Sequence, residues 1–282
     1  MPKSKWNLNT IYISERLQES LRPISRCAMT TVVAPMGYGK TTAVEWYLAE
    51  RAGAEAPYIV RISVYSGNLA IFWKSAQDAF ARAGFAFLRE YDCPTDGASG
   101  GLLIDDLCHA LTGEKSCYIF IDDFHLLTDK RAPGFLCALA GRLPPNVHLI
   151  LASRDLFLPA AELIRLGGKV YQIGTAQLRL NHTELAVYTN RCGTALSDEQ
   201  IDTLLYYSEG WFSAVYLNLR MFSEHGVLPD PNSDISSIFT AAMIDPLPEK
   251  QREFLAVMGL ADEFTVEMAQ FVMEDAHAED LL

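Results

Sequence analysis

The fold is decided by the stretch TVVAPMGYGKTTAVEWYL, which runs from Thr31 to Leu48. It has the pattern of a strand, a glycine-bearing loop and a helix in succession. A phosphate-binding loop has this order and the consensus G-x-x-x-x-G-K-[ST]. Ala34 stands where the consensus has its first glycine. Nucleotide binding therefore depends on whether a methyl group is tolerated at this position.

The two glycines closest to the phosphate are present. In such a loop, successive backbone N–H groups and the N-terminus of the following helix converge on the phosphate. Gly37 and Gly39 occupy the places where a side chain would most obstruct that approach. Ala34 lies on the strand side, where a methyl group is tolerated if the backbone keeps a negative φ. The alanine weakens the match to the consensus more than it weakens the chemistry.

The residues after the glycines carry the rest of the chemistry. Lys40 is predicted to bridge the β- and γ-phosphates, the Thr41 hydroxyl to bind Mg²⁺, and Thr42 to donate to the α-phosphate. The alternative is a chance glycine turn before a helix, which the strand-loop-helix context disfavours. The predicted nucleotide-binding residues of the loop are Pro35, Met36, Gly37, Tyr38, Gly39, Lys40, Thr41 and Thr42.

A second motif, YIFIDDFHLL, is an apolar strand that ends in two acids. Such a strand places carboxylates at the carboxyl edge of a sheet, where a phosphate loop also lies. Asp122 is predicted to hold Mg²⁺ through water, and Asp123 to orient or deprotonate the attacking water. Aspartates also cap helices, so the pair alone is weak evidence. Its place downstream of the phosphate loop, in the order of Walker A and Walker B motifs, favours the catalytic interpretation.

A third apolar strand, LILASRD, brings Arg154 to the same sheet edge as Lys40 and Asp122. An arginine there can sense a γ-phosphate by charge-assisted hydrogen bonds, although a solvated arginine after a strand fits the spacing equally well. His125 could report the phosphate state to neighbouring elements. A lone histidine after a strand is more often structural.

The first part of the chain alternates strand and helix patterns. Apolar runs indicate strands at 28–35, 58–64, 117–123, 147–153 and 169–174, and helix-like segments lie at 40–53, 68–83, 101–112 and 132–143. Four of the runs are almost continuously apolar, as in parallel strands buried on both faces. The expected fold class is α/β, a three-layer P-loop sandwich with a parallel sheet over residues 1–178.

The strand pattern ends near Leu178. Asn181 or Thr183 could cap one helix, and Ser197 begins another with Glu199 in a capping-like arrangement. We expect a small helical domain over 179–228, joined by a proline-bearing linker to further short helices in 229–282. Apolar helices at the end of the chain suggest a sequence cut inside a third domain.

Composition narrows the class of protein. Half of the residues are apolar and a fifth charged, which is typical of a soluble globular protein. The net charge of -12 argues against this chain itself gripping a nucleic acid. No apolar run is long enough for a bilayer span, and the first ten residues lack the apolar centre of a signal peptide, so a cytoplasmic location without a membrane partner is expected. Six scattered cysteines predict reduced thiols and no metal site.

The order of motifs resembles a known family. APMGYGKTT, FIDDFHLL, LPPNVHLILASRD, LRLNHTELAVY and SEGWFSAVYLNL are similar to the N-terminal ATPase module of LuxR-type large ATP-binding regulators. These are STAND-class ATPases of the maltose-activator type, and the resemblance covers about 11–276. It implies a nucleotide-binding domain, a helical domain and the start of a winged-helix-like domain in 229–282. The helical-repeat sensor arm and the DNA-binding helix-turn-helix have no counterpart in this sequence.

The resemblance also implies roles for single residues. Lys40 and Thr41 match the Walker A pair, Asp122 and Asp123 the Walker B acids, and Arg154 the sensor-1 arginine. The segment ISERL resembles the one that lies near the adenine, with Arg16 a candidate contact. EGW matches the family's Gly-Trp turn, but Phe212 replaces the proline that often follows it.

The implied function is a switch that reads ATP against ADP. ADP would hold a closed monomer, and ATP with a small-molecule or protein inducer would open it for self-oligomerisation and transcription activation, with slow Mg²⁺-dependent hydrolysis. Whether the chain is an enzyme beyond a weak ATPase stays open. DNA would be bound only through the absent domain.

Two other classes of protein fit the sequence less well than a nucleotide switch. A stand-alone P-loop kinase or other metabolic NTPase would need an acceptor pocket and an arginine-rich lid, and the segment after Arg154 instead runs into helices. A non-hydrolysing scaffold is disfavoured because both Walker motifs keep their functional side chains.

Overall fold

The computed structural model describes residues 7–8, 10–225, 228, 240, 244–245, 247–261, 264–275 and 277–278. The chain divides into two compact units: Thr10–Glu184, and Leu185–Leu282 together with Met1–Asn9. The division falls within helix α8 (His182–Arg191), a few residues beyond the expected boundary at 178. The domain limits 1–178, 179–228 and 229–282 stay predictions.

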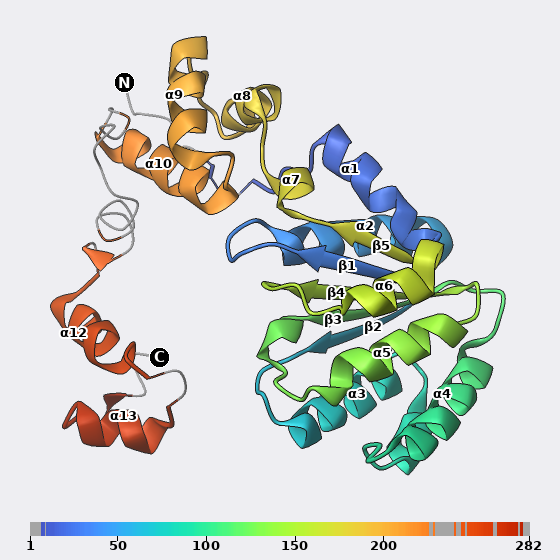
Figure 1. Ribbon diagram of the computed structural model, residues 1–282. Helices are drawn as coiled ribbons and strands as arrows, with labels where there is room; N and C mark the ends of the chain where they lie inside the picture. The colour runs from blue at the N-terminus through green and yellow to red at the C-terminus, as the bar shows by residue number, and fades with distance from the viewer. Residues whose placement is uncertain are drawn as a thin grey trace. The chain divides into compact units, whose positions relative to one another are not determined.

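The first unit is built on a five-stranded parallel sheet (Figure 1). Its strands are β1 (Met29–Val33), β2 (Tyr58–Ser63), β3 (Cys117–Asp122), β4 (Val147–Ser153) and β5 (Val170–Ile173). They lie in the order β2-β3-β4-β1-β5, and every adjacent pair is parallel. The five strands expected from the apolar runs are confirmed. Because β4 lies between β1 and β3, the residues that follow it lie between the two motif-bearing strands.

Helices cover both faces of the sheet, which makes the three predicted layers (Figure 1). One face packs against α3 (Leu69–Arg82), α4 (Gly97–Leu111), α5 (Arg131–Arg142) and α6 (Ala160–Leu166). The other packs against α1 (Glu15–Leu21), α2 (Lys40–Glu55) and α7 (Thr175–Leu178). Along β3, Ile119 and Ile121 belong to the first core, and Tyr118 and Phe120 to the second. Alternate side chains thus enter two apolar layers, which explains the continuous apolar runs.

Short 3₁₀ turns complete this unit: η1 (Arg22–Ser25), η2 (Ala86–Glu90), η3 (Phe124–Leu126) and η4 (Gly167–Lys169). The four helices expected between the strands are present, but α4 begins at Gly97 rather than Gly101. Asp96 fixes that start, because its carboxylate accepts a 2.8 Å hydrogen bond from the Ser99 N–H in a capping box.

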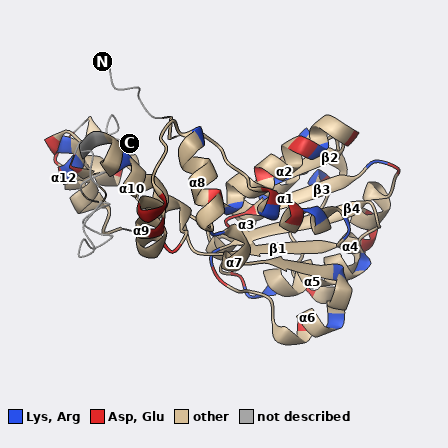
Figure 2. Cartoon of the chain, turned by 90° about the horizontal axis from the view of Figure 1, so that it is seen from above, with Lys and Arg blue, Asp and Glu red and all other residues tan. Residues whose placement is uncertain are grey.

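The described residues of the second unit form helices joined by loops. It contains α9 (Asp198–Ser208), α10 (Phe212–His225), α12 (Glu249–Met258) and α13 (Val266–Val272). Acidic residues gather on α9 (Figure 2). The linker expected at 227–234 lies outside the described residues except for Leu228. Among the helices that the structure describes, none has both the length and the apolar character of a bilayer span.

Side-chain caps define the helices after Leu178. Asn181 caps α8, accepting a 2.9 Å hydrogen bond from the Glu184 N–H. Ser197 caps α9 as predicted, but its partner in the capping box is Gln200 rather than Glu199. The third position after the cap is the one whose side chain reaches back to the cap N–H, and Glu199 stands one residue too early.

The EGW turn lies between α9 and α10. Glu209 and Gly210 both have positive φ there, at 49° and 73°. Phe212, in place of the family's proline, is the first residue of α10, and its ring centroid lies 5.2 Å from that of Tyr188. The position is thus used for packing within the helical unit.

Candidate functional site

The loop between β1 and α2 has the backbone of a phosphate cradle. Gly37 and Gly39 have φ values of 81° and 76°, in the left-handed region that favours glycine. Ala34 is not among the non-glycine residues with positive φ, and it is 1% exposed in the core beneath α1 and α2. Its methyl group therefore packs into the domain. The condition set by the sequence for alanine at this position is met.

The N-terminus of α2 is the anion-binding end of this loop. Gly39 is its N-cap residue and gives it no side-chain cap. The positive end of the helix dipole therefore faces the loop without an oxygen side chain at the cap, as in helices that bind phosphate. Of the flanking residues, Met36 is 61% exposed, Thr42 lies exposed on the first turn, and Tyr38 packs partly against the core beneath α1 and α2.

Lys40 is the buried cation of the site. Its Nζ donates hydrogen bonds to the backbone carbonyls of Ala34, at 2.8 Å, and Pro35, at 3.0 Å. Burial, and then the charge of Arg154, lower the pKa of Lys40, while Asp123 and Asp122 act in the opposite direction. The loop carbonyls thus hold the ammonium between the phosphate loop and the acidic pair Asp122 and Asp123.

Asp122 lies beside the first turn of α2. Its carboxylate lies close enough to the Thr41 side chain for the hydroxyl to lower its pKa, and it accepts a 2.9 Å hydrogen bond from the Asp123 N–H. Burial raises the pKa of Asp122 and outweighs both effects. A hydroxyl and a carboxylate oxygen side by side suit Mg²⁺, which commonly takes one or two protein ligands and completes its shell with phosphate and water. Within the described residues no three acidic, histidine or cysteine side chains gather into a metal site, so Mg²⁺ would depend on those additional ligands.

The backbone turns sharply after Asp122. Asp123 has a φ of 53°, in the left-handed region, and its side chain is 47% exposed. Left-handed backbone at a residue other than glycine is uncommon, and aspartate is one of the few side chains that tolerates it. The turn separates the two carboxylates: Asp122 faces Thr41, while Asp123 remains open to water.

His125 lies under this turn with its side chain 10% exposed. Neither ring nitrogen has a hydrogen-bond partner, since the Asp123 carboxylate is 3.9 Å from Nδ1. Burial, and next the charge of Arg154, lower the pKa of His125. The imidazole is therefore neutral near pH 7.

Arg154 follows β4, the strand between β1 and β3. The preceding residue, Ser153, accepts a 3.3 Å hydrogen bond from the Ala34 N–H, which ties the end of β4 to the start of the loop. Arg154 is exposed, and its charge acts on both Lys40 and His125. The structure thus brings together Lys40, Thr41, the acidic pair and Arg154 at one sheet edge. The role of Arg154 toward a γ-phosphate stays a prediction.

Arg16 has a different environment. Its Nε and Nη2 both donate to the Glu184 carboxylate at 2.9 Å, and its Nη1 and Nη2 donate to the carbonyls of Ala176 and Arg179 at 3.1 and 2.6 Å. The guanidinium thus joins α1 to the corner between α7 and α8. Sequence reasoning missed Glu184, although the spacing Asn181-x-x-Glu184 is a capping-box signal. Contact between Arg16 and adenine stays a prediction.

No family model matches the chain. Its sequence is similar to proteins named HTH-type transcriptional regulator MalT. The one from Vibrio campbellii is 21% identical over 283 aligned residues, 93% of this chain and 30% of the relative. The one from Yersinia pestis is 24% identical over 211 residues, 74% of this chain and 23% of the relative. The chain is related to the MalT regulators. The resemblance expected from the motif order is thereby confirmed.

The fold comparison agrees with this relationship. A Walker-type ATPase of Pyrococcus abyssi matches 99% of this chain and 92% of its own, with a TM-score of 0.53 and 10% identity. At that identity the match shows the P-loop ATPase fold alone. The chain spans less than a third of the length of the MalT relatives. The sequence is thus similar to part of these regulators, and the fold is similar to that of a Walker-type ATPase.

Proposed function

We propose that this chain is the nucleotide-operated switch of a LuxR-type transcription regulator, binding ATP or ADP with Mg²⁺. The observation that carries the proposal is the meeting of Lys40, Asp122 and Arg154 at one sheet edge beside an uncapped helix N-terminus. The relatedness to MalT regulators gives the class of protein.

Different residues contact different phosphates of the nucleotide. The loop N–H groups and the N-terminus of α2 hold the β-phosphate, a contact that ADP and ATP share. Lys40 uses two of its N–H donors on Ala34 and Pro35, and its third can reach the β- and γ-phosphates. Arg154 contacts the γ-phosphate by charge-assisted hydrogen bonds, so it distinguishes ATP from ADP.

Thr41 and Asp122 would hold Mg²⁺, which when bound neutralises charge on the phosphate oxygens. Asp123 orients the attacking water or takes a proton from it, since its carboxylate is turned away from Asp122 toward solvent. Bulk water solvates an exposed carboxylate and so weakens its hold on a single attacking water. Hydrolysis is therefore slow and serves to reset the switch.

The remaining parts of the activity involve regions outside this chain. We propose that ATP, together with a small-molecule or protein inducer, opens the regulator for self-oligomerisation and transcription activation. DNA would be bound by another domain, in keeping with the net charge of -12 here. The name of the relatives, HTH-type transcriptional regulator, supports the assignment of DNA binding to another domain.

Hydrogen exchange in Mg²⁺–ADP and in Mg²⁺ with a non-hydrolysable ATP analogue tests the switch. We expect the two nucleotides to give different protection in the segments 120–127 and 152–156, and a turnover far below the ordinary enzyme rate of about 10 per second. Identical protection together with rapid phosphoryl transfer to a small acceptor would instead support a metabolic kinase.

A further inference from the structure

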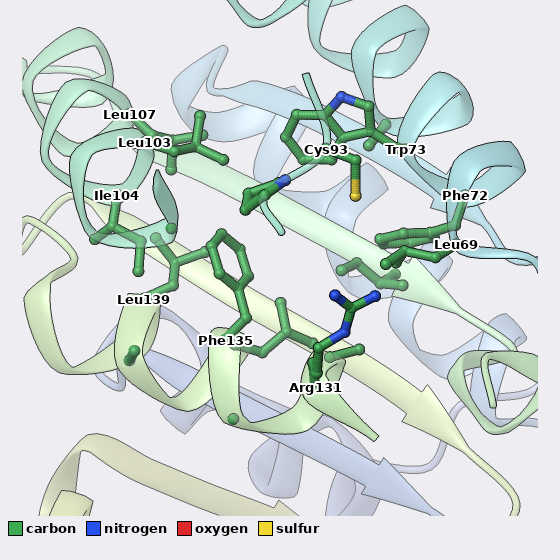
Figure 3. A pocket seen from close by; sticks show the side chains of 18 of the residues that line it. Leu69, Phe72, Trp73, Cys93, Leu103, Ile104, Leu107, Arg131, Phe135 and Leu139 are labelled. Atoms are coloured by element: carbon green, nitrogen blue, oxygen red, sulfur yellow. The ribbon is translucent and has the colours of Figure 1, made fainter. Parts of the chain in front are cut away.

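A cavity of about 400 Å³ lies on the face of the sheet that α3, α4 and α5 cover. Figure 3 shows side chains that line it. Native interiors are packed as densely as organic crystals and hold few voids larger than a water molecule. The volume falls instead in the range of small-molecule sites. Apolar and aromatic side chains make most of its wall, among them Leu69, Phe72, Trp73, Leu103, Ile104 and Phe135.

Glycines on α4 leave part of the cavity wall without side chains. Gly100 is buried, and a Cβ atom built on it would meet the Phe135 ring at 3.5 Å and the Pro94 side chain at 3.8 Å, both in the cavity wall. Glycine costs about 1 kcal/mol relative to alanine in a helix interior. A larger side chain at Gly100 would therefore both favour the helix and occupy the space, yet the sequence leaves this position bare.

The charged groups at the cavity already have partners. Arg131 is held by Asp129 at 2.7 Å and donates to the Thr95 carbonyl at 3.3 Å. Arg142 pairs with Asp105 at 2.9 Å. No lining cation that the structure describes is left for a ligand anion.

The other polar groups in the wall are also weak ionic partners. The Asp96 carboxylate caps α4 by accepting from Ser99. Burial raises the pKa of the Cys93 thiol, whose sulfur faces the cavity, so the thiol is uncharged. A charged ligand would lose its hydration without gaining a counter-ion, and the cost of burying an unpaired charge is large.

We propose that this cavity binds a small, uncharged, mainly apolar molecule with an aromatic or similarly flat ring system. Phe72, Trp73 and Phe135 offer ring faces and edges to such a body (Figure 3). The neutral Cys93 thiol and the Thr95 side chain lie in the wall where one polar substituent could be accommodated.

The cavity shares a wall with the candidate nucleotide site. Ile121 and Phe124 line it, and they flank Asp122 and Asp123 along the chain. A bound molecule would therefore touch the end of β3 from the face opposite Thr41. The binding itself does not depend on the proposed switch and is tested without any nucleotide.

The uncharged fluorophore N-phenyl-1-naphthylamine is a suitable probe, because its emission rises and shifts to the blue in apolar surroundings. We expect saturable binding of one molecule per chain. Filling the cavity with Gly100→Leu should weaken that binding at least tenfold. Gly53→Leu is the matched control, because Gly53 is an exposed helix residue of α2 with open space at its Cβ position, and this variant should bind the probe as the wild type does.

Melting temperatures separate a filled cavity from a misfolded variant. Gly100→Leu should melt close to the wild-type temperature, because leucine is the better helix former and the contact at its Cβ position is an ordinary van der Waals distance. Failure of the wild type to bind the probe saturably would overturn the proposal. Equal affinity in the wild type and in a folded filling variant would do the same, because the probe would then lie elsewhere.

Discussion

The ammonium group of Lys40 donates a 2.8 Å hydrogen bond to the backbone carbonyl of Ala34. Residue 34 thus contributes its carbonyl to the site and its methyl group to the core, where it is 1% exposed. A glycine would offer the same carbonyl without the methyl group. The departure from the phosphate-loop consensus therefore concerns packing rather than nucleotide chemistry.

The substitution Ala34→Gly separates the packing of the methyl group from the role of the backbone carbonyl in the site. The variant should lose about 1–2 kcal/mol of unfolding free energy, from one buried methyl group and from the greater entropy of glycine in the unfolded chain. Its affinity for ADP should stay within about twofold of the wild type, since a change of that size corresponds to less than 1 kcal/mol. Urea denaturation and calorimetry measure the two quantities. A tighter complex with the glycine variant would show that alanine does hinder the nucleotide.

Arg154→Ala should weaken ATP binding by about 10- to 100-fold, the value of a charged hydrogen bond, and ADP binding much less. The reason is that the charge of Arg154, just after the end of β4, acts on Lys40, the residue that we propose to contact the β- and γ-phosphates. Arg89, an exposed arginine on η2, pairs with Asp78 on α3. Arg89→Ala is the control and should change neither the ATP affinity nor the ADP affinity. Equal losses for ATP and ADP would exclude a role specific to the γ-phosphate.

Glu184→Gln should cost about 1–3 kcal/mol of unfolding free energy. The Glu184 side chain is 8% exposed, so its loss leaves the Arg16 guanidinium short of a partner, although Arg16 itself is 39% exposed and partly solvated. Glu19→Gln is the matched control, because Glu19 lies on the same helix as Arg16 and pairs with Arg22 at the start of η1, with both side chains more than half exposed. That surface pair should be worth under 1 kcal/mol. A loss no larger for Glu184→Gln than for Glu19→Gln would contradict the structural role of the pair.

The same carboxylate makes stability depend on pH. Burial alone would raise the pKa of Glu184, but hydrogen bonds from Arg16, Ser14 and the Asn181 N–H together lower it. A carboxyl whose folded pKa is lowered stabilises the protein above its unfolded pKa and loses that contribution as the pH falls through the folded value. The difference between wild type and Glu184→Gln should therefore shrink below about pH 4.5, the ordinary value for glutamate.

The fold was predictable where side-chain periodicity was strong. The strands at 117–122 and 147–153 are buried on both faces, and their apolar runs gave the correct bounds closely. Helix α1, of seven residues, was not expected as a helix, because so short a segment gives little periodic signal. The start of α4 was placed too late, since Gly97 and Gly100 resemble a loop and only the Asp96 cap shows otherwise.

The candidate site was predictable in its members because parallel strands end at one edge of a sheet. Its geometry was not. The left-handed turn at Asp123, which separates the two carboxylates, follows from tertiary packing. Arg16 and Glu184 are 168 residues apart in the sequence. Neither sequence segment alone indicates that the two side chains pair. The cavity likewise depends on how α3, α4 and α5 pack against the sheet.

Calorimetric titration of Mg²⁺–ATP and Mg²⁺–ADP into wild type and Lys40→Ala tests the central claim most directly. Lys74→Ala, an exposed lysine on α3, is the control. Lys74→Ala should bind each nucleotide as tightly as the wild type does. Lys40→Ala should keep a wild-type hydrogen-exchange pattern across the sheet yet bind them about 10- to 100-fold more weakly, because a buried ammonium that serves the phosphates is gone. Unchanged affinity in a folded Lys40→Ala variant would contradict nucleotide binding at this loop.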